Sequence, residues 1–152
     1  MNKLKNLLNQ KTIDNPELWF ESVCNLLFYR TVFHIKDQSY KITEAELYLN
    51  SDEHPDVFAH GSADQKKAEL FYFHKRGESY QEGNIKGVDI TFGNENRVGG
   101  ILLRGMQNLD KGKKPDYIDG PGLLSQRILD VFEKEKVADL APKLNIDIFN
   151  AK

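Results

Sequence analysis

The sequence predicts an α+β fold, a mainly antiparallel β-sheet flanked by helices, and two observations lead to this fold class. The expected elements run helix, then strands, then helix, without the regular β-α-β alternation of parallel sheets. Two strand-like runs within residues 27–49 are joined by a short polar segment, which indicates an antiparallel hairpin. The length of 152 residues suits one domain with a substantial core, so we expect residues 1–152 to form a single domain.

The first expected helix begins at Pro16, which follows Asn15, a residue type that caps helices well. Apolar residues then recur on one helix face at Trp19, Val23, Leu26 and Leu27. The runs "LFYRTVFHI" and "YKITEAELYL" look like strands, and the polar "KDQS" between them would form the turn of the hairpin. The segment that follows reads as a polar loop.

Three further strands are expected in "AELFYFHK", "KGVDITFG" and "VGGILLRGM", because these apolar runs are separated by glycine-rich turns. The segment "LDKGKKPDYIDGPG" reads as a long loop. A helix is then expected to begin near Pro121, with Leu124, Ile128 and Val131 on one face. A short helix over about residues 137–144 and the run "NIDIF" close the chain.

The composition is that of an ordinary globular protein, with 39% apolar residues, 29% charged residues and a formal net charge of −2. This charge does not by itself indicate a nucleic acid or an acidic membrane as partner. A single cysteine, Cys24, excludes a disulfide within the chain and fits a reducing compartment. No apolar run approaches the roughly 20 residues of a membrane span, and the apolar run at the N-terminus is too short for a signal peptide. We therefore expect a cytoplasmic protein.

Two carboxylates and a phenol share one face of the expected strand at residues 40–49. Strand alternation directs the apolar residues of this run towards a core and Glu44, Glu46 and Tyr48 to the other face. The Cβ atoms of the two glutamates would lie about 7 Å apart, which leaves room for a water or one substrate atom. The pattern fits either an ordinary solvated face or the floor of a site.

The loop "DEHPDVFAH" carries acidic residues together with His54 and His60, which are possible metal ligands. Their spacing matches no zinc signature, and the chain contains no CxxC, HExxH or phosphate-binding glycine loop. A polar loop is the simpler interpretation, so we expect neither a metal nor a cofactor.

Five short segments keep one order between about residues 16 and 129. They are the E-x-E-x-Y-L run with its acidic loop, the Leu70-Phe71 pair, "VDITFG", "GGILLRGMQ" and "GPGLLSQRI". Together they resemble motifs of the 3-methyladenine (alkyladenine) DNA glycosylase family, which include "ETEAYL", a Met-Phe pair, "VLLRALEP" and "GPxKLxQAL". In this resemblance Asp89 stands where the family has an active-site Asn, and Arg104 matches the family's arginine.

The resemblance implies a 3-methyladenine DNA glycosylase-like fold and a monofunctional enzyme that hydrolyses the N-glycosidic bond of alkylated purines in double-stranded DNA. Glu46 would activate water on the face opposite the departing base, as carboxylates do in sugar hydrolysis, and Glu44 would tune it. Arg104 would hold either acidic groups or a phosphate. We expect the enzyme to be a monomer.

The resemblance also implies a base pocket, because a base must leave the stack to be reached. Tyr48 and His60 would form one wall, and either Tyr80 or Phe73 the other. Asp89 would lie against the base, where the change from Asn affects purine discrimination.

Contacts to phosphates would come from basic residues in the loops between the strands, although the family's DNA-wedging aromatic has no counterpart here. The same residues also fit an ordinary solvated surface. The second interpretation of the whole chain is a non-catalytic module of the same fold that binds a nucleobase or another flat ligand. The basic candidates are Lys66, Lys67 and Arg76, with Lys75, Lys86, Arg97, Lys111, Lys113 and Lys114 as further ones.

Overall fold

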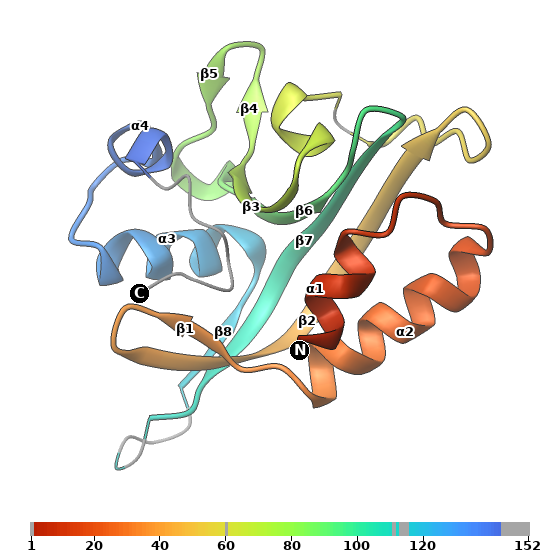
Figure 1. The fold of residues 1–152 in the computed structure, drawn as a ribbon. Coiled ribbons are helices and arrows are strands. Elements are labelled where there is room, and N and C mark those ends of the chain that lie inside the picture. The colour runs from red at the N-terminus through yellow and green to blue at the C-terminus, as the bar shows by residue number, and fades with distance from the viewer. Residues whose placement is uncertain (1, 60, 111, 113–115, 144–152) are drawn as a thin grey trace.

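The computed structural model describes residues 2–59, 61–110, 112 and 116–143, which form a curled, mainly antiparallel sheet with helices packed against it (Figure 1). The α-helices are α1 (Lys3–Leu8), α2 (Pro16–Tyr29), α3 (Pro121–Val131) and α4 (Val137–Leu140), and short 3-10 turns are η1 (Ala63–Lys66), η2 (Gly83–Ile85) and η3 (Ala141–Lys143). The strands are β1 (Phe33–Ile35), β2 (Gln38–Ser51), β3 (Ala68–Phe73), β4 (Lys75–Arg76), β5 (Ser79–Tyr80), β6 (Val88–Phe92), β7 (Arg97–Asn108) and β8 (Asp116–Asp119). The α+β class with a mainly antiparallel sheet is therefore confirmed.

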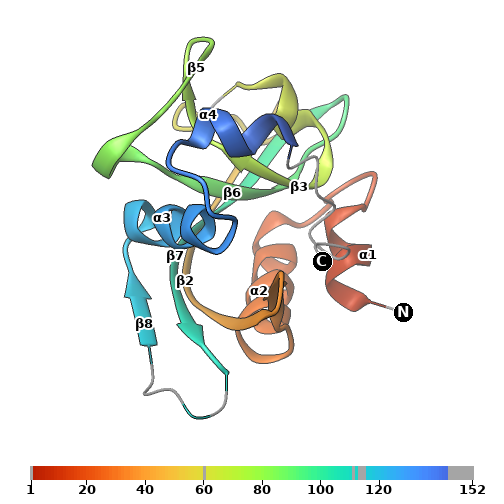
Figure 2. The same ribbon diagram turned by 90° about the vertical axis from the view of Figure 1, so that its left-hand side faces the viewer.

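The main sheet has the strand order β1-β2-β7-β6-β3, with β8 also paired to β7, and all of these pairs are antiparallel. The long strands β2 and β7 run through its centre (Figure 1). Helices α1 and α2 lie to one side of these strands and α3 and α4 to the other (Figure 1). The rotated view shows α3 and α2 on opposite sides of β2 and β7 (Figure 2). Strands β4 and β5 form a separate two-stranded ribbon.

Helix α2 begins as the sequence predicts, because the side chain of Asn15 accepts a hydrogen bond from the Leu18 amide at 3.1 Å. It ends at Tyr29, so Leu27 to Tyr29 are helical and the first part of the strand expected in "LFYRTVFHI" is wrong. The physical reason is the helical stripe of Trp19, Val23 and Leu27, all three of which are buried. This stripe has more apolar area to bury than an edge strand would gain.

The predicted hairpin is present but shorter, with β1 and β2 joined at Lys36 and Asp37. The register of β2 on β7 shifts around Glu44, which marks a β-bulge. Gly105 faces the bulge, because a Cβ at that position would lie 2.7 Å from Thr43 Oγ1. Before the bulge Tyr40 and Ile42 point into the core; after it the inward positions are odd-numbered, as at Leu49.

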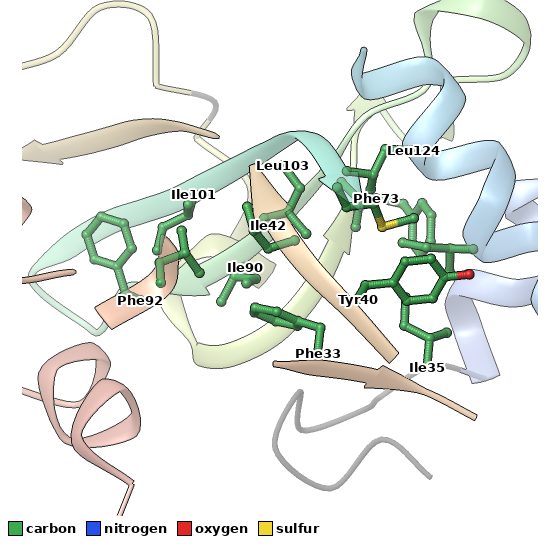
Figure 3. Packing of buried hydrophobic residues seen from close by; sticks show 14 of the residues in the cluster. Phe33, Ile35, Tyr40, Ile42, Phe73, Ile90, Phe92, Ile101, Leu103 and Leu124 are labelled. Carbon is green, nitrogen blue, oxygen red and sulfur yellow. The ribbon is translucent and has the colours of Figure 1, made fainter. Parts of the chain in front are cut away.

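The hydrophobic core lies inside the curl of the sheet and is built from the four α-helices and the strands of the main sheet (Figure 3). Ile42, Ile90, Ile101 and Leu103 come from the central strands and are at most 2% exposed. The helices close this core with the following side chains: Leu4, Leu8, Trp19, Val23, Leu27, Leu124, Ile128 and Leu129.

Three local features differ from the sequence-based expectations. Helix α1 was not expected, and its Asn2 cap accepts from the amides of Leu4 and Lys5. Strand β8 lies within the segment predicted as a long loop. The helix expected over "PGLLSQRILDVFEKEK" ends earlier, because α3 stops at Val131 and Glu133 has a φ of +55°. The run "NIDIF" lies outside the described residues. Within the described parts, no helix has the length and apolar character that a membrane crossing needs.

Candidate active site

Residues from four neighbouring strands form a row across one face of the main sheet. Glu46 of β2 lies opposite Leu102 of β7, Leu102 lies opposite Asp89 of β6, and Asp89 lies opposite Tyr72 of β3. Directly opposed residues project to the same face of a sheet. The four residues, which we call the Glu46 row, therefore share one face and span three strand spacings of about 4.8 Å each.

Arg104 connects the two glutamates of β2. Its Nη1 donates to Glu46 Oε1 at 2.6 Å, and its Nε donates to Glu44 Oε1 at 3.1 Å. Both carboxylates therefore lie on one face, as predicted. Of the two alternatives for Arg104, the structure shows the one in which it holds acidic groups. The side chain of Glu46 is 42% exposed, so its carboxylate is held in place and still meets water.

Tyr48 holds the other oxygen of the same carboxylate, because its hydroxyl donates to Glu46 Oε2. Burial of the phenol raises the pKa of Tyr48 to about 12, helped by the hydrogen bond to Glu46 and by the negative charges of Glu46 and Asp89. The phenol is therefore a protonated donor at neutral pH. Both oxygens of Glu46 thus have a fixed donor, which sets the plane of the carboxylate.

Asp89 is buried, with 1% of its surface exposed. Its Oδ1 lies 2.6 Å from His74 Nε2, and its Oδ2 accepts from Gln65 Nε2 at 3.1 Å. A Cβ at Gly100 would lie 2.5 Å from Oδ2, so the backbone of β7 closes the remaining side. Both carboxylate oxygens are held by protein groups, and the expected direct contact between Asp89 and a base is not open in this arrangement.

The other predicted wall residues are spread over different environments. Phe73 is 2% exposed in the core, on the opposite face of β3 from Tyr72, so it does not face the Glu46 row. Tyr80 lies in the β4–β5 ribbon, with the Lys75 ammonium 4.8 Å from its ring centroid. Tyr72, the residue before Phe73, is the aromatic residue of the Glu46 row. His60 lies outside the described residues.

The basic candidates divide into exposed and buried groups. Lys66, Lys67 and Arg76 are exposed, and the two lysines directly follow Gln65, which donates to Asp89. Arg97 is buried and donates to the carbonyls of Gln10, Lys11 and Phe92, and burial lowers its pKa.

Lys86 is also buried and donates to Gln126 at 2.7 Å. Arg97 and Lys86 are therefore wrong as phosphate contacts, because their charged groups are already used inside the protein. Lys75 pairs with Asp64. Lys111, Lys113 and Lys114 lie outside the described residues.

The sequence interpretation missed Gln65, Tyr72 and His74 as members of the site. A signal for two of them exists in "AELFYFH", where alternation separates Tyr72 and His74 from the apolar Phe71 and Phe73. The partner of His74 is 15 positions away in the sequence, so no local pattern reveals the contact. The described residues hold no group of three or more metal-ligating side chains, and His54 instead contacts the carbonyl of Leu49 through Nδ1.

A hollow of about 380 Å³ lies elsewhere, between the α1–α2 connection, the end of β2 and the β6–β7 turn. Its charged lining mixes Lys11 and Arg97 with Asp14, Asp52 and Glu53. It includes none of the residues of the Glu46 row. Its opposed charges offer no net preference for a ligand, so the Glu46 row remains the better candidate.

Comparison with known proteins gives one relative of undefined activity. The chain is similar to the uncharacterized protein L759 of Acanthamoeba polyphaga mimivirus, with 28% identity over 150 residues that cover 90% of this chain and 68% of the viral protein. No protein-family model and no solved structure matches the chain. The relative adds no activity, so any function rests on the site.

Proposed function

We propose that this chain is a monofunctional DNA glycosylase-like enzyme that hydrolyses the N-glycosidic bond of alkylated purines in DNA, with a fold of the 3-methyladenine DNA glycosylase type. One observation carries the proposal. The residues that the resemblance selects, Glu46, Tyr48 and Arg104, are separated by up to 58 positions and form one hydrogen-bonded group on a water-accessible part of the sheet.

The geometry suits water activation by Glu46. Loss of the base leaves an oxocarbenium-like sugar, which a carboxylate can stabilise while it takes a proton from the attacking water. Each carboxylate oxygen has two lone-pair directions, so Glu46 can accept from water while Arg104 and Tyr48 fix its orientation. Arg104 also balances the charge of Glu44. The Glu44 side chain is 54% exposed, and its negative charge acts on Glu46 from the edge of the site.

The sheet face that carries Glu46 also supplies the proposed contacts to the substrate. Tyr48 offers its ring to a flipped base, and an electron-poor alkylated purine stacks well on such a ring. Lys66 and Lys67 supply positive charge for the phosphates beside Gln65. The reaction needs neither a metal nor a cofactor, and the chain would act as a cytoplasmic monomer in base excision repair.

The second candidate is a non-catalytic module of the same fold that binds a nucleobase or another flat ligand. The observation that favours it is that both oxygens of Glu46 already have donors within the chain. A carboxylate whose charge serves only to hold Arg104 and Tyr48 would stabilise the site without activating water.

Incubation with methylated duplex DNA, followed by chromatography of the released bases, separates the two candidates. The enzyme proposal predicts release of free alkylated purine at a rate above that of spontaneous depurination. Retained DNA binding without any released base would support the binding module instead. Release in the absence of added metal, in a chelating buffer, is also expected.

A further inference from the structure

A small aromatic cavity lies at the edge of the main sheet, where β3 is the outermost strand among the described residues. The cavity measures about 140 Å³, and β5 and η3 close it together with β3. Four aromatic residues contribute to its lining, and the acidic residue of the lining is Asp64. The aromatic residues are Phe71, Tyr72, Phe73 and Tyr80.

The chain already places one of its own cations against this lining. The ammonium of Lys75 lies 4.8 Å from the centroid of Tyr80 and 3.6 Å from Asp64 Oδ2. Lys75 and Tyr80 are cross-strand partners in the β4–β5 ribbon, so this cation–π contact is local. Burial acts to lower the pKa of Lys75, but Tyr80, Asp64 and Tyr72 outweigh it and raise the pKa. The surroundings therefore favour positive charge.

The contacts of the Lys75 ammonium with Tyr80 and Asp64 are replaceable. The side chains of Lys75 and Asp64 are 24% and 42% exposed, and exposed ion pairs of this kind are weak. A lysine ammonium is also a strongly hydrated charge, so it loses water when it enters an aromatic cavity. A methylated ammonium has no such shell of tightly held water and suits aromatic faces better.

We propose that this cavity binds a small organic cation, a quaternary or methylated ammonium group, against Tyr72 and Tyr80 with Asp64 as its counter-ion. The volume is below the roughly 300 Å³ of ordinary ligand pockets, so it takes a head group and not a drug-sized molecule. The proposal does not depend on base release, although Tyr72 also belongs to the Glu46 row. The cation can come from a free small molecule or from a methylated lysine side chain.

Titration of the intact protein with choline and with 3,3-dimethylbutan-1-ol, its uncharged counterpart of the same shape, tests the proposal. We expect choline to bind at least about fivefold more tightly, because only the cation gains the ring and carboxylate attraction. A third titration uses the acetylated, amidated form of trimethyllysine. Tighter binding of this probe assigns a side-chain source, and tighter binding of choline assigns a free small molecule.

Two variants give opposite expected changes in choline affinity. Lys75→Ala removes the competing ammonium and should strengthen binding, whereas Asp64→Asn removes the counter-ion and should weaken it, each by about threefold or more. Glu95→Gln, which removes an exposed carboxylate in the β6–β7 turn, is the matched control and should change nothing. Equal binding of choline and the alcohol, no binding of either, or an unchanged affinity in Lys75→Ala overturns the proposal.

Discussion

At the scale of single residues, Arg104 forms hydrogen bonds of different length with the two glutamates of β2. Glu46 receives the shorter bond, at 2.6 Å, and a second donor from Tyr48, whereas Glu44 receives only the Nε bond at 3.1 Å. Glu46 is therefore oriented by two groups and Glu44 by one. This difference is the structural reason for assigning water activation to Glu46 in the proposed reaction.

Glu46→Gln should abolish base release, because the amide keeps the shape of the side chain but cannot take a proton from water. The expected loss is at least the roughly 10² to 10⁴ that general base catalysis supplies. Glu44→Gln is the matched control, since it removes the same charge two residues away, and it should cost much less. Single-turnover excision of 3-methyladenine measures both, with melting temperatures to check folding. Release by Glu46→Gln within about tenfold of wild type, worth only ~1.4 kcal/mol of barrier, would reject the assignment.

Tyr48 gives a pH-dependent contribution to stability that can be measured without any substrate. Its pKa rises from 10.0 to about 12 on folding, so the folded state holds the phenol proton more tightly. The stabilisation is therefore complete below pH 10 and is lost as the pH rises through 12. The difference in free energy of unfolding between wild type and Tyr48→Phe should be constant from pH 8 to 10 and shrink towards pH 12.

Denaturant titrations of both proteins at several pH values test this expectation. All other titrating groups are common to the two proteins and cancel in the difference. A difference that stays constant through pH 12 would mean that neither burial nor the contact with Glu46 raises the pKa of Tyr48 on folding.

At the scale of elements, the sequence predicted most of what local pattern controls. The cap at Asn15, the hairpin turn and the strands at residues 68–73, 88–92 and 97–108 follow from residue types and apolar period. The errors occurred where tertiary packing decides. The segment from Leu27 to Tyr29 has strand propensity but completes a helical stripe, and β8 has only four residues between turn signals.

The polar group around Asp89 shows why part of the site could not be predicted. Its members, Gln65, His74 and Asp89, come from η1, the end of β3 and β6, and only the antiparallel pairing of β3 with β6 brings them together. The Asp89 carboxylate also needs a residue without a side chain beside it on β7, and this residue is Gly100. A single sequence contains no local sign of such a contact.

Gly100→Ala should destabilise the protein through the Asp89 group. The added Cβ would lie 2.5 Å from Asp89 Oδ2, so the carboxylate must move away from Gln65 and His74. Overpacking of this kind costs about 1–3 kcal/mol. Gly61→Ala is the control, because a Cβ there meets nothing within 4 Å, and its melting temperature should be unchanged or slightly higher. Equal melting temperatures for the two variants would show that β7 does not confine Asp89.

At the scale of the whole molecule, the charge that a DNA partner would meet differs from the charge that the sequence suggests. The formal net charge is −2, but Arg97 and Lys86 are buried and so do not add charge to the surface. Arg104 and Lys75 form ion pairs with carboxylates. The sequence could supply the candidates but not their burial, which depends on the packing of distant elements. Lys66 and Lys67 remain exposed next to the Asp89 group and are the best test of DNA binding.

If DNA is the partner, affinity for any duplex should fall steeply as salt rises, because association releases counterions from the phosphates. Replacing Lys66 and Lys67 with Ala should weaken binding to all sequences alike and make the slope of log affinity against log salt shallower by about one unit per lost phosphate contact. The matched control is the double variant Lys3→Ala and Lys136→Ala, which removes the same charge from two other exposed lysines and should keep the wild-type slope. Fluorescence anisotropy with a labelled duplex between about 50 and 200 mM salt measures all three proteins. A flat salt response of the wild type, or an equal change in both double variants, would show that Lys66 and Lys67 form no DNA contact and would favour the small-ligand module over the glycosylase.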